Sequence, residues 1–216
     1  MLTRKLLLLT LAAVCVASPC AAQETAAVDP RKPSGVSQVV VAVHMSTTDF
    51  RIRETKDIGV LTIEEFKSIR LTDFDFAARL GDELVSALSE DKRAQWRMAK
   101  AGEKEQLAYL FGRDSWEQNS YAPPSLESDR VLLVGAGCAA DASAFFATIH
   151  VEVALRLVDC KSGKVLLKKG VGKSTRFPGR PKGMFADNQK VLKETLNKLT
   201  EQVALKVKQH VSKSPI

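Results

Sequence analysis

An alternation of apolar with mixed residues over positions 149–158 constrains the fold of this chain more than any other feature. A period of two places alternate residues on one face of a β-strand. The apolar set is Ile149, Val151, Val153, Leu155 and Leu157. Residues 159–163 have the composition of a turn, and apolar residues resume after them. The pattern therefore predicts a long C-terminal β-hairpin with one buried face.

Two amphipathic helices are predicted, one well before this hairpin and one closing the chain. The first follows Thr72–Asp75, which has the form of a capping box, and its apolar residues recur every four positions. The second begins after Asp187, whose side chain can cap it. The apolar stripes are Phe76, Leu80, Leu84 and Leu88 in the first helix, and Leu192, Leu196, Leu199, Val203, Val207 and Val211 in the second.

Shorter segments predict the remaining elements. Apolar, β-branched runs predict strands at 39–43, 58–63 and 131–134, the last ending in glycines. Residues 96–111 are expected to hold a short strand and then a short helix. Strands and helices alternate early, and paired strands precede the last helix. This order predicts an α/β (α+β) fold, a mixed sheet with amphipathic helices packed on it.

The first 22 residues have the pattern of a secretory signal peptide. Arg4 and Lys5 give a positive start, residues 6–17 carry no charge, and small residues precede Gln23. The uncharged run is too short to cross a bilayer as a helix. We therefore expect an exported protein. Its expected parts are a signal peptide (1–22), a flexible lead-in (23–35), a single domain (36–211) and a tail (212–216).

The exported chain would keep two cysteines, Cys138 and Cys160. An even pair in an oxidising compartment can form a disulfide. The alternative is two small buried side chains that never meet, and both interpretations stay open. In the leader, Cys15 and Cys20 follow a valine and a proline, whereas acylated lipoprotein cysteines follow a small residue. The sequence thus disfavours a lipid anchor, although it leaves attachment to the outer membrane open.

Residues 160–186 contain eight basic side chains and no acidic one. One interpretation is a solvated hairpin edge, where lysines discourage strand-to-strand aggregation. The other is a surface for an anionic membrane or an acidic protein. Nucleic acid is not expected, since Phe177 and Phe185 are the segment's sole base-stacking candidates. The candidate contact surface consists of Lys161, Lys164, Lys168, Lys169, Lys173 and Arg176.

Two glycine-containing segments resemble cofactor motifs but lack their context. Residues 135–140 have dinucleotide-binding spacing, yet the following segment is short for a crossover helix, and glycines ending a strand explain the same letters. Residues 172–175 lack the first glycine of a phosphate-binding P-loop. The histidines His44, His150 and His210 show no metal-ligand spacing. We predict no catalytic residue, no cofactor and no metal.

The hairpin sequence Val153–Leu166, read as strand, Asp159, Ser162-Gly163 turn and strand, is similar to one in a group of bacterial envelope proteins. That group includes the curli-secretion channel (CsgG) family and the LpoB-like periplasmic activators of penicillin-binding proteins. The resemblance extends over residues 55–210 in the pattern and order of elements. It implies a non-enzymatic α/β domain that docks to envelope machinery or oligomerises, with no catalytic residues to carry over.

These observations predict a periplasmic accessory or assembly protein of the bacterial cell envelope. It would act through contacts with an envelope protein or with copies of itself. Two alternatives stay open. One is a periplasmic enzyme of unknown chemistry, in which His44 and His150 would be tested first. The other is a binding module for anionic lipid or glycan, whose binding would weaken as salt screens its charges.

Overall fold

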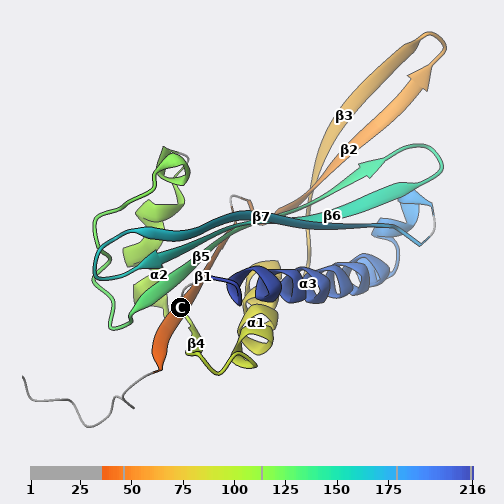
Figure 1. Cartoon of the computed structure of the whole chain (residues 1–216). Helices are drawn as coiled ribbons and strands as arrows, with labels where there is room; N and C mark the ends of the chain where they lie inside the picture. The colour runs from red at the N-terminus through yellow and green to blue at the C-terminus, as the bar shows by residue number, and fades with distance from the viewer. Residues whose placement is uncertain (1–35, 46, 113, 179, 215) are drawn as a thin grey trace, which may run out of the picture. The chain divides into compact units, whose positions relative to one another are not determined.

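One mixed sheet of seven strands organises the structure (Figure 1). The computed structural model describes residues 36–216 apart from positions 46, 113, 179 and 215, so the predicted signal peptide and lead-in lie outside the described residues. The strands are β1 (Ser37–Met45), β2 (Asp49–Ile58), β3 (Leu61–Arg70), β4 (Ala94–Met98), β5 (Arg130–Ala142), β6 (Ala147–Asp159) and β7 (Val165–Arg176). The helices are α1 (Phe76–Ser89), α2 (Ala101–Leu107) and α3 (Lys190–Val211). The sheet with its helices confirms the predicted fold class.

The predicted C-terminal hairpin is confirmed, with β6 paired on both sides and β7 paired on one. β6 pairs antiparallel with β5 along its whole length, from Ala147 opposite Ala142 to Asp159 opposite Arg130. On its other side β6 pairs antiparallel with β7. All five apolar residues of the predicted alternation are buried. Among the described strands β7 pairs with β6 alone, so it forms an edge of the sheet.

β1 and β2 lie one after the other along the same side of β5, and both are parallel to it. Pairing between β2 and β5 stops at Ala142, where β5 ends. β2 then continues with β3 as its partner, and Figure 1 shows this hairpin standing away from β5, β6 and β7. The strand predicted at 58–63 is therefore wrong. Ile58 ends β2, Leu61 begins β3, and Gly59 forms the turn with a φ of 64°.

β5 does not end at its glycines, as the sequence had suggested, but runs through Gly135 and Gly137 to Ala142. It continues because alternate residues beyond the glycines, including Cys138 and Ala140, remain buried in the core. The next segment is the turn of the β5–β6 hairpin. The dinucleotide-like spacing therefore lies within a sheet strand, where it offers no loop to a phosphate.

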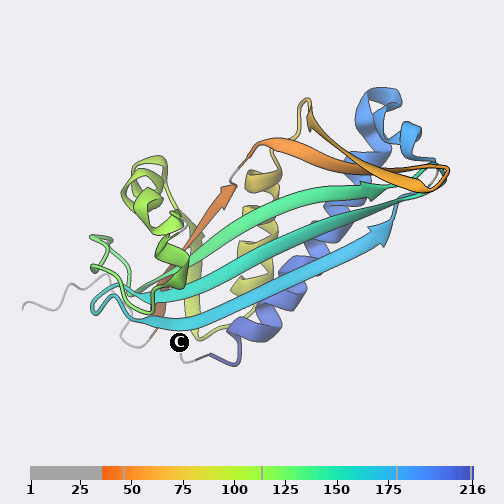
Figure 2. The ribbon, with the colours of Figure 1, turned by 90° about the horizontal axis from the view of Figure 1, so that it is seen from above.

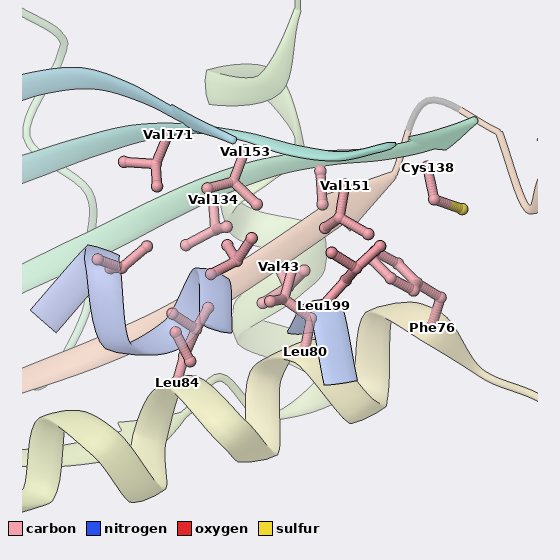
Figure 3. Packing of buried hydrophobic residues seen from close by; sticks show 14 of the residues in the cluster. Val43, Phe76, Leu80, Leu84, Val134, Cys138, Val151, Val153, Val171 and Leu199 are labelled. Atoms are coloured by element: carbon pink, nitrogen blue, oxygen red, sulfur yellow. The ribbon is translucent and has the colours of Figure 1, made fainter. Parts of the chain in front are cut away.

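α1 and α3 cover one face of the sheet and bury the predicted apolar stripes (Figure 2). Figure 3 shows Leu84 of α1 and Leu199 of α3 among the strand residues Val134, Val151 and Val153. Burying a side chain of this size stabilises a fold by about 1.5 to 3 kcal/mol. This helix-covered face therefore contains the main core. No described helix is long and apolar enough to span a membrane.

The helix starts differ slightly from those predicted. Asp75 caps α1, because its carboxylate accepts a hydrogen bond from the Ala78 amide at 2.9 Å. Asp187 lies in a short 3-10 turn, and α3 begins after Gln189. In both cases the apolar stripe predicted the helix correctly. The capping position depends on the backbone path into the helix, which the spacing of side chains does not specify.

The opposite face of the sheet is covered at one end only. There α2 and the 3-10 turn Ala108–Phe111 pack on β1 and β5, where they form a second, smaller core. Its buried members include Val40, Leu107, Leu110 and Leu133. Beyond this covered end none of the described helices lies on this face (Figure 1). We call this uncovered part the open face.

Candidate functional site

The open face carries a groove whose floor consists almost entirely of glycine and alanine. Neighbouring strands place these small residues side by side in two rows across β5, β6 and β7. The rows are Gly135, Ala154 and Gly170, followed by Gly137, Glu152 and Gly172. Because most of these residues have little or no side chain, the sheet backbone itself is exposed. The hollow above them has a volume of about 640 Å³, which falls within the range of ligand sites.

One end of the groove is an aromatic wall. His44, at the end of β1, stacks on Phe111 with ring centroids 4.9 Å apart. Phe111 in turn lies 6.2 Å from Trp116. A Cβ atom at position 135 would come within 2.9 Å of the Trp116 ring, so a larger residue there would displace the ring. The wall therefore contacts the floor directly.

Arg156 supports this wall from the adjoining part of β6. Its side chain is fully buried, and its guanidinium carbon lies 4.9 Å from the centroid of the Trp116 ring. It donates hydrogen bonds to the Gln118 carbonyl at 2.6 Å and to the Tyr121 hydroxyl. A buried arginine keeps its charge, so it needs such partners. These contacts hold the segment that carries Trp116 against the sheet.

The other end of the groove is polar. A second hollow of about 360 Å³ shares Gly137 and Glu152 with the first, so the two form one groove. At this end Asp141 accepts a hydrogen bond from Arg53 at 2.8 Å and lies 3.0 Å from His150. The hydrogen bond from Arg53 to Asp141 raises the pKa of Arg53. The groove thus joins an apolar end to a charged one.

The composition of the groove limits what it can bind. Among the described residues, Glu152 is the one carboxylate that lines the larger hollow. No group of three or more described His, Cys, Asp or Glu residues could hold a metal ion. His44 lines the aromatic end and His150 lines the polar end, so the two histidines belong to different parts of the groove. The arrangement suits an apolar ligand that carries one positive charge.

Cys138 and Cys160 are both free thiols, so the disulfide that the sequence left open is absent. They lie on opposite faces of the sheet, in the two separate cores. Cys160 directly follows Asp159, which pairs with Arg130 of β5. Cys138 lies eight residues beyond Arg130 along the same strand, opposite Val151. That separation is about 27 Å, far beyond the reach of a disulfide. Burial raises the pKa of Cys138 to about 12 and also raises the pKa of Cys160.

The six basic residues of the predicted contact surface do not form one patch. Lys161 and Lys164 lie in the β6–β7 turn. Lys168 and Arg176 share the side of β7 that carries the groove glycines, while Lys169 and Lys173 alternate to the other side. A flat partner could not contact all six. Their role as a contact surface stays a prediction.

Sequence reasoning missed the residues that build the groove. Phe111 and Trp116 lie in segments that predict no binding site, and Glu152 is one of the mixed residues that alternate with apolar ones over positions 149–158. The available signal was the repeated Gly-x-Gly spacing at 135–137 and 170–172. Within paired strands such spacing leaves one face of the sheet without side chains at these positions. The first of these two segments resembled a cofactor motif instead.

Comparisons with known proteins identify no family for this chain. No protein-family model matches it, and no curated protein matches it. Solved structures with a similar fold include a Xanthomonas campestris protein of family DUF330, 11% identical over 85% of this chain and 91% of that one, with a TM-score of 0.47. The minor lipoprotein from Acinetobacter baumannii is 7% identical over 83% of this chain and 94% of that one, with a TM-score of 0.46.

The hypothetical protein CT253 from Chlamydia trachomatis is also similar. It is 14% identical over 82% of this chain and 99% of that one, with a TM-score of 0.47. These three structures are of bacterial proteins, and one of them is a lipoprotein. Identities and TM-scores this low carry no inference about what this chain binds. The resemblance to the CsgG and LpoB-like groups stays a prediction.

Proposed function

We propose that this protein is an exported accessory protein of the bacterial cell envelope that binds a partner protein in the groove of its open face. Export is supported by the signal-peptide pattern of residues 1–22. Action through protein contacts is supported by the groove, which offers apolar walls and a floor of exposed backbone. Its occupant would be an extended apolar segment of the partner.

The observation that carries the proposal is the presence of glycine at positions 137 and 170. Both lie inside strands, where glycine weakens the sheet relative to residues with side chains. A Cβ atom added at either position would meet nothing within 4 Å. The fold itself therefore has no steric need for glycine there. Interior strand glycines commonly mark a β-bulge, a tight bend or a place where another molecule approaches the backbone closely. The strand pairing has no bulge at Gly137 or Gly170, which favours close approach by another molecule.

The chemistry of the groove favours a peptide segment with one basic side chain. Phe111 and Trp116 offer apolar and aromatic surface at one end, which suits aliphatic or aromatic side chains. The Glu152 carboxylate lies in the floor and is exposed. A lysine or arginine of the partner can pair with it. This charge complementarity distinguishes the proposed occupant from an acidic peptide, which Glu152 would repel.

A peptide library displayed on phage tests the binding site whatever the identity of the partner. We expect selection on the purified protein to enrich extended apolar peptides that contain one lysine or arginine. Gly170→Leu fills the groove from its floor and should abolish their binding. Glu152→Gln should weaken binding severalfold and remove the preference for a basic residue. Lys169→Glu, on the other side of β7, is the matched control and should change nothing.

Binding in the groove and export to the envelope are tested by separate experiments. If the wild-type protein and Gly170→Leu enrich the same peptides to the same extent, or neither enriches any, the groove is not the binding site. Export is tested by the mass of the protein recovered from the envelope of its native host. A chain beginning at Gln23 is the expected result. An uncleaved chain confined to the cytoplasm would overturn the envelope role.

A further inference from the structure

Beyond the groove, one end of the sheet presents three separate apolar tips. The first is the tip of the β2–β3 hairpin, residues 58–63. The second is the β5–β6 turn, which holds Phe145 and Phe146. The third is the 3-10 turn Pro181–Phe185. Both views place these tips at the same end of the strands (Figures 1 and 2).

The tips expose large apolar side chains to solvent. In the hairpin tip Val60 is fully exposed, and Ile58 and Leu61 are 58% and 64% exposed. Phe145 in the β5–β6 turn is 81% exposed. Single exposed apolar residues are common on soluble proteins. A group of them gathered at one end is typical of an interaction surface.

A ladder of ion pairs lies behind the hairpin tip. Lys56 pairs with Glu65 at 2.7 Å, and Lys67 pairs with Glu54 at 2.6 Å. Beyond Lys56 the hairpin continues for two rungs and a turn. The first rung joins Asp57 to Thr62, whose hydroxyl donates a hydrogen bond to the Asp57 carboxylate at 2.9 Å, and the second joins Ile58 to Leu61. The length beyond Lys56 is about 10 Å at the rise of a β-strand. It matches the depth of roughly 5–10 Å to which interfacial anchors bury their apolar groups in a bilayer.

Basic side chains surround the other two tips. The guanidinium carbon of Arg176 lies 5.3 Å from the centroid of the Phe146 ring. Arg180 and Lys182 are exposed beside the third tip, and the segment 161–186 contains no acidic residue. Basic residues beside exposed aromatic ones are typical of proteins at the interface of an anionic membrane.

We propose that this end of the protein docks on the surface of an anionic phospholipid bilayer. The hairpin tip enters as far as the boundary of the acyl chains, and Phe145 and Phe146 lie among the headgroups. Arg176, Arg180 and Lys182 face the lipid phosphates. A bilayer fits better than a protein partner because it is fluid. It accommodates three tips from separate segments, whereas a protein partner would need a matching pocket for each.

Co-sedimentation of the purified protein with lipid vesicles tests this docking. We expect binding to mixed phosphatidylcholine–phosphatidylglycerol vesicles and much weaker binding to pure phosphatidylcholine, because the basic side chains need an anionic surface. The double variant Val60→Glu, Leu61→Glu should lower the partition coefficient at least tenfold. The control is Leu205→Glu on α3, where the leucine is 54% exposed. It introduces the same change away from the tips and should bind as the wild type does.

The charge contribution has its own variant. Arg180→Glu with Lys182→Glu should weaken binding to the phosphatidylglycerol vesicles and reduce its dependence on salt. Circular dichroism, together with retained peptide binding in the groove, establishes that each variant is folded. Absence of vesicle binding by the wild type, or unchanged binding by Val60→Glu, Leu61→Glu, would overturn the proposal. The proposal would also be overturned if the wild type formed an oligomer without lipid and the double variant were monomeric, since the tips would then bind another copy of the chain.

Discussion

The two faces of strands β5, β6 and β7 come from alternate residues of the same segments, yet they differ in composition and in cover. On the helix-covered face Val153 and Val171 pack beneath α1 and α3. One residue away on each strand, Ala154 and Gly170 face the open groove. Because alternation gives each face its own residues, one face can stabilise the fold while the other carries few bulky side chains.

The covered end of the second face lies between these extremes. Leu155 and Arg156 are consecutive residues of β6, and both are fully buried. Leu155 belongs to the main core, whereas Arg156 points to the other face and hydrogen-bonds the segment that carries the aromatic wall. The groove thus begins where this support ends. Three variants test how differently the two faces contribute to stability.

The largest effect is expected on the helix-covered face. Leu155→Ala removes a fully buried side chain from the main core and should lower the free energy of unfolding by about 3 kcal/mol, through lost burial and the cavity that remains. Urea unfolding followed by circular dichroism measures the change. Leu205→Ala, at an exposed position of α3, should stay within about 0.5 kcal/mol of the wild type. Equal losses for the two variants would contradict the assignment of the main core.

An intermediate effect is expected where α2 covers the second face. Arg97 of β4 pairs with Glu103 of α2 at 2.6 Å, and its hydrogen bond lowers the pKa of Glu103 from 4.5 to about 2. The pair therefore stabilises the fold above pH 4.5, and its contribution is lost as the pH falls toward 2. We expect about 1 kcal/mol, since the pair is partly exposed and water screens it.

Urea unfolding measured across this pH range tests the ion pair. Glu103→Gln should be less stable than the wild type at neutral pH, and its stability should depend less on pH in the acid range. Glu105→Gln, on the same helix, should keep the wild-type dependence. If Glu103→Gln and the wild type lose stability in parallel on acidification, the pair does not stabilise the covered end.

The smallest effect is expected in the floor of the groove. Gly170→Ala should change the free energy of unfolding by less than about 0.5 kcal/mol, because nothing occupies the space and the substitution restricts the unfolded chain. Gly163→Ala is the contrasting variant. Its φ of 70° and the Tyr121 carbonyl beside it should make the loss exceed about 1 kcal/mol. A comparable loss for Gly170→Ala would mean that the fold itself requires this glycine.

Periodic patterns predicted most of the fold. The alternation around Val153 and the stripes containing Leu84 and Leu199 identified β6, α1 and α3, because burial acts on whichever residues share a face. The prediction of a strand at 58–63 was wrong because no described element buries these residues. Apolar and β-branched composition resembles a buried strand, but these residues form an exposed hairpin tip. Composition records how apolar a segment is, not whether another element covers it.

The candidate site was less predictable than the fold. Basic residues from Lys161 to Arg176 form one run of charge in the sequence, but strand alternation divides β7's members between two faces. Gly135 and Gly137 resemble a cofactor motif, although in the fold they belong to the groove floor that crosses β5, β6 and β7. The aromatic wall at the end of this floor contains Phe111 and Trp116, which come from a segment without periodicity. Its position depends on long-range contacts such as the hydrogen bond from Arg156 to Gln118.

The local pattern of this chain was sufficient to specify β6, α1 and α3, the fold class and the apolar residues that these three elements bury in the main core. Those properties follow from the period of apolar residues along each segment. The groove, the cluster of exposed tips and the separation of Cys138 from Cys160 required the folded structure. Each depends on strand register and on which side of the sheet a residue occupies. A shift of one residue in register reverses that side, and only the assembled sheet defines the register.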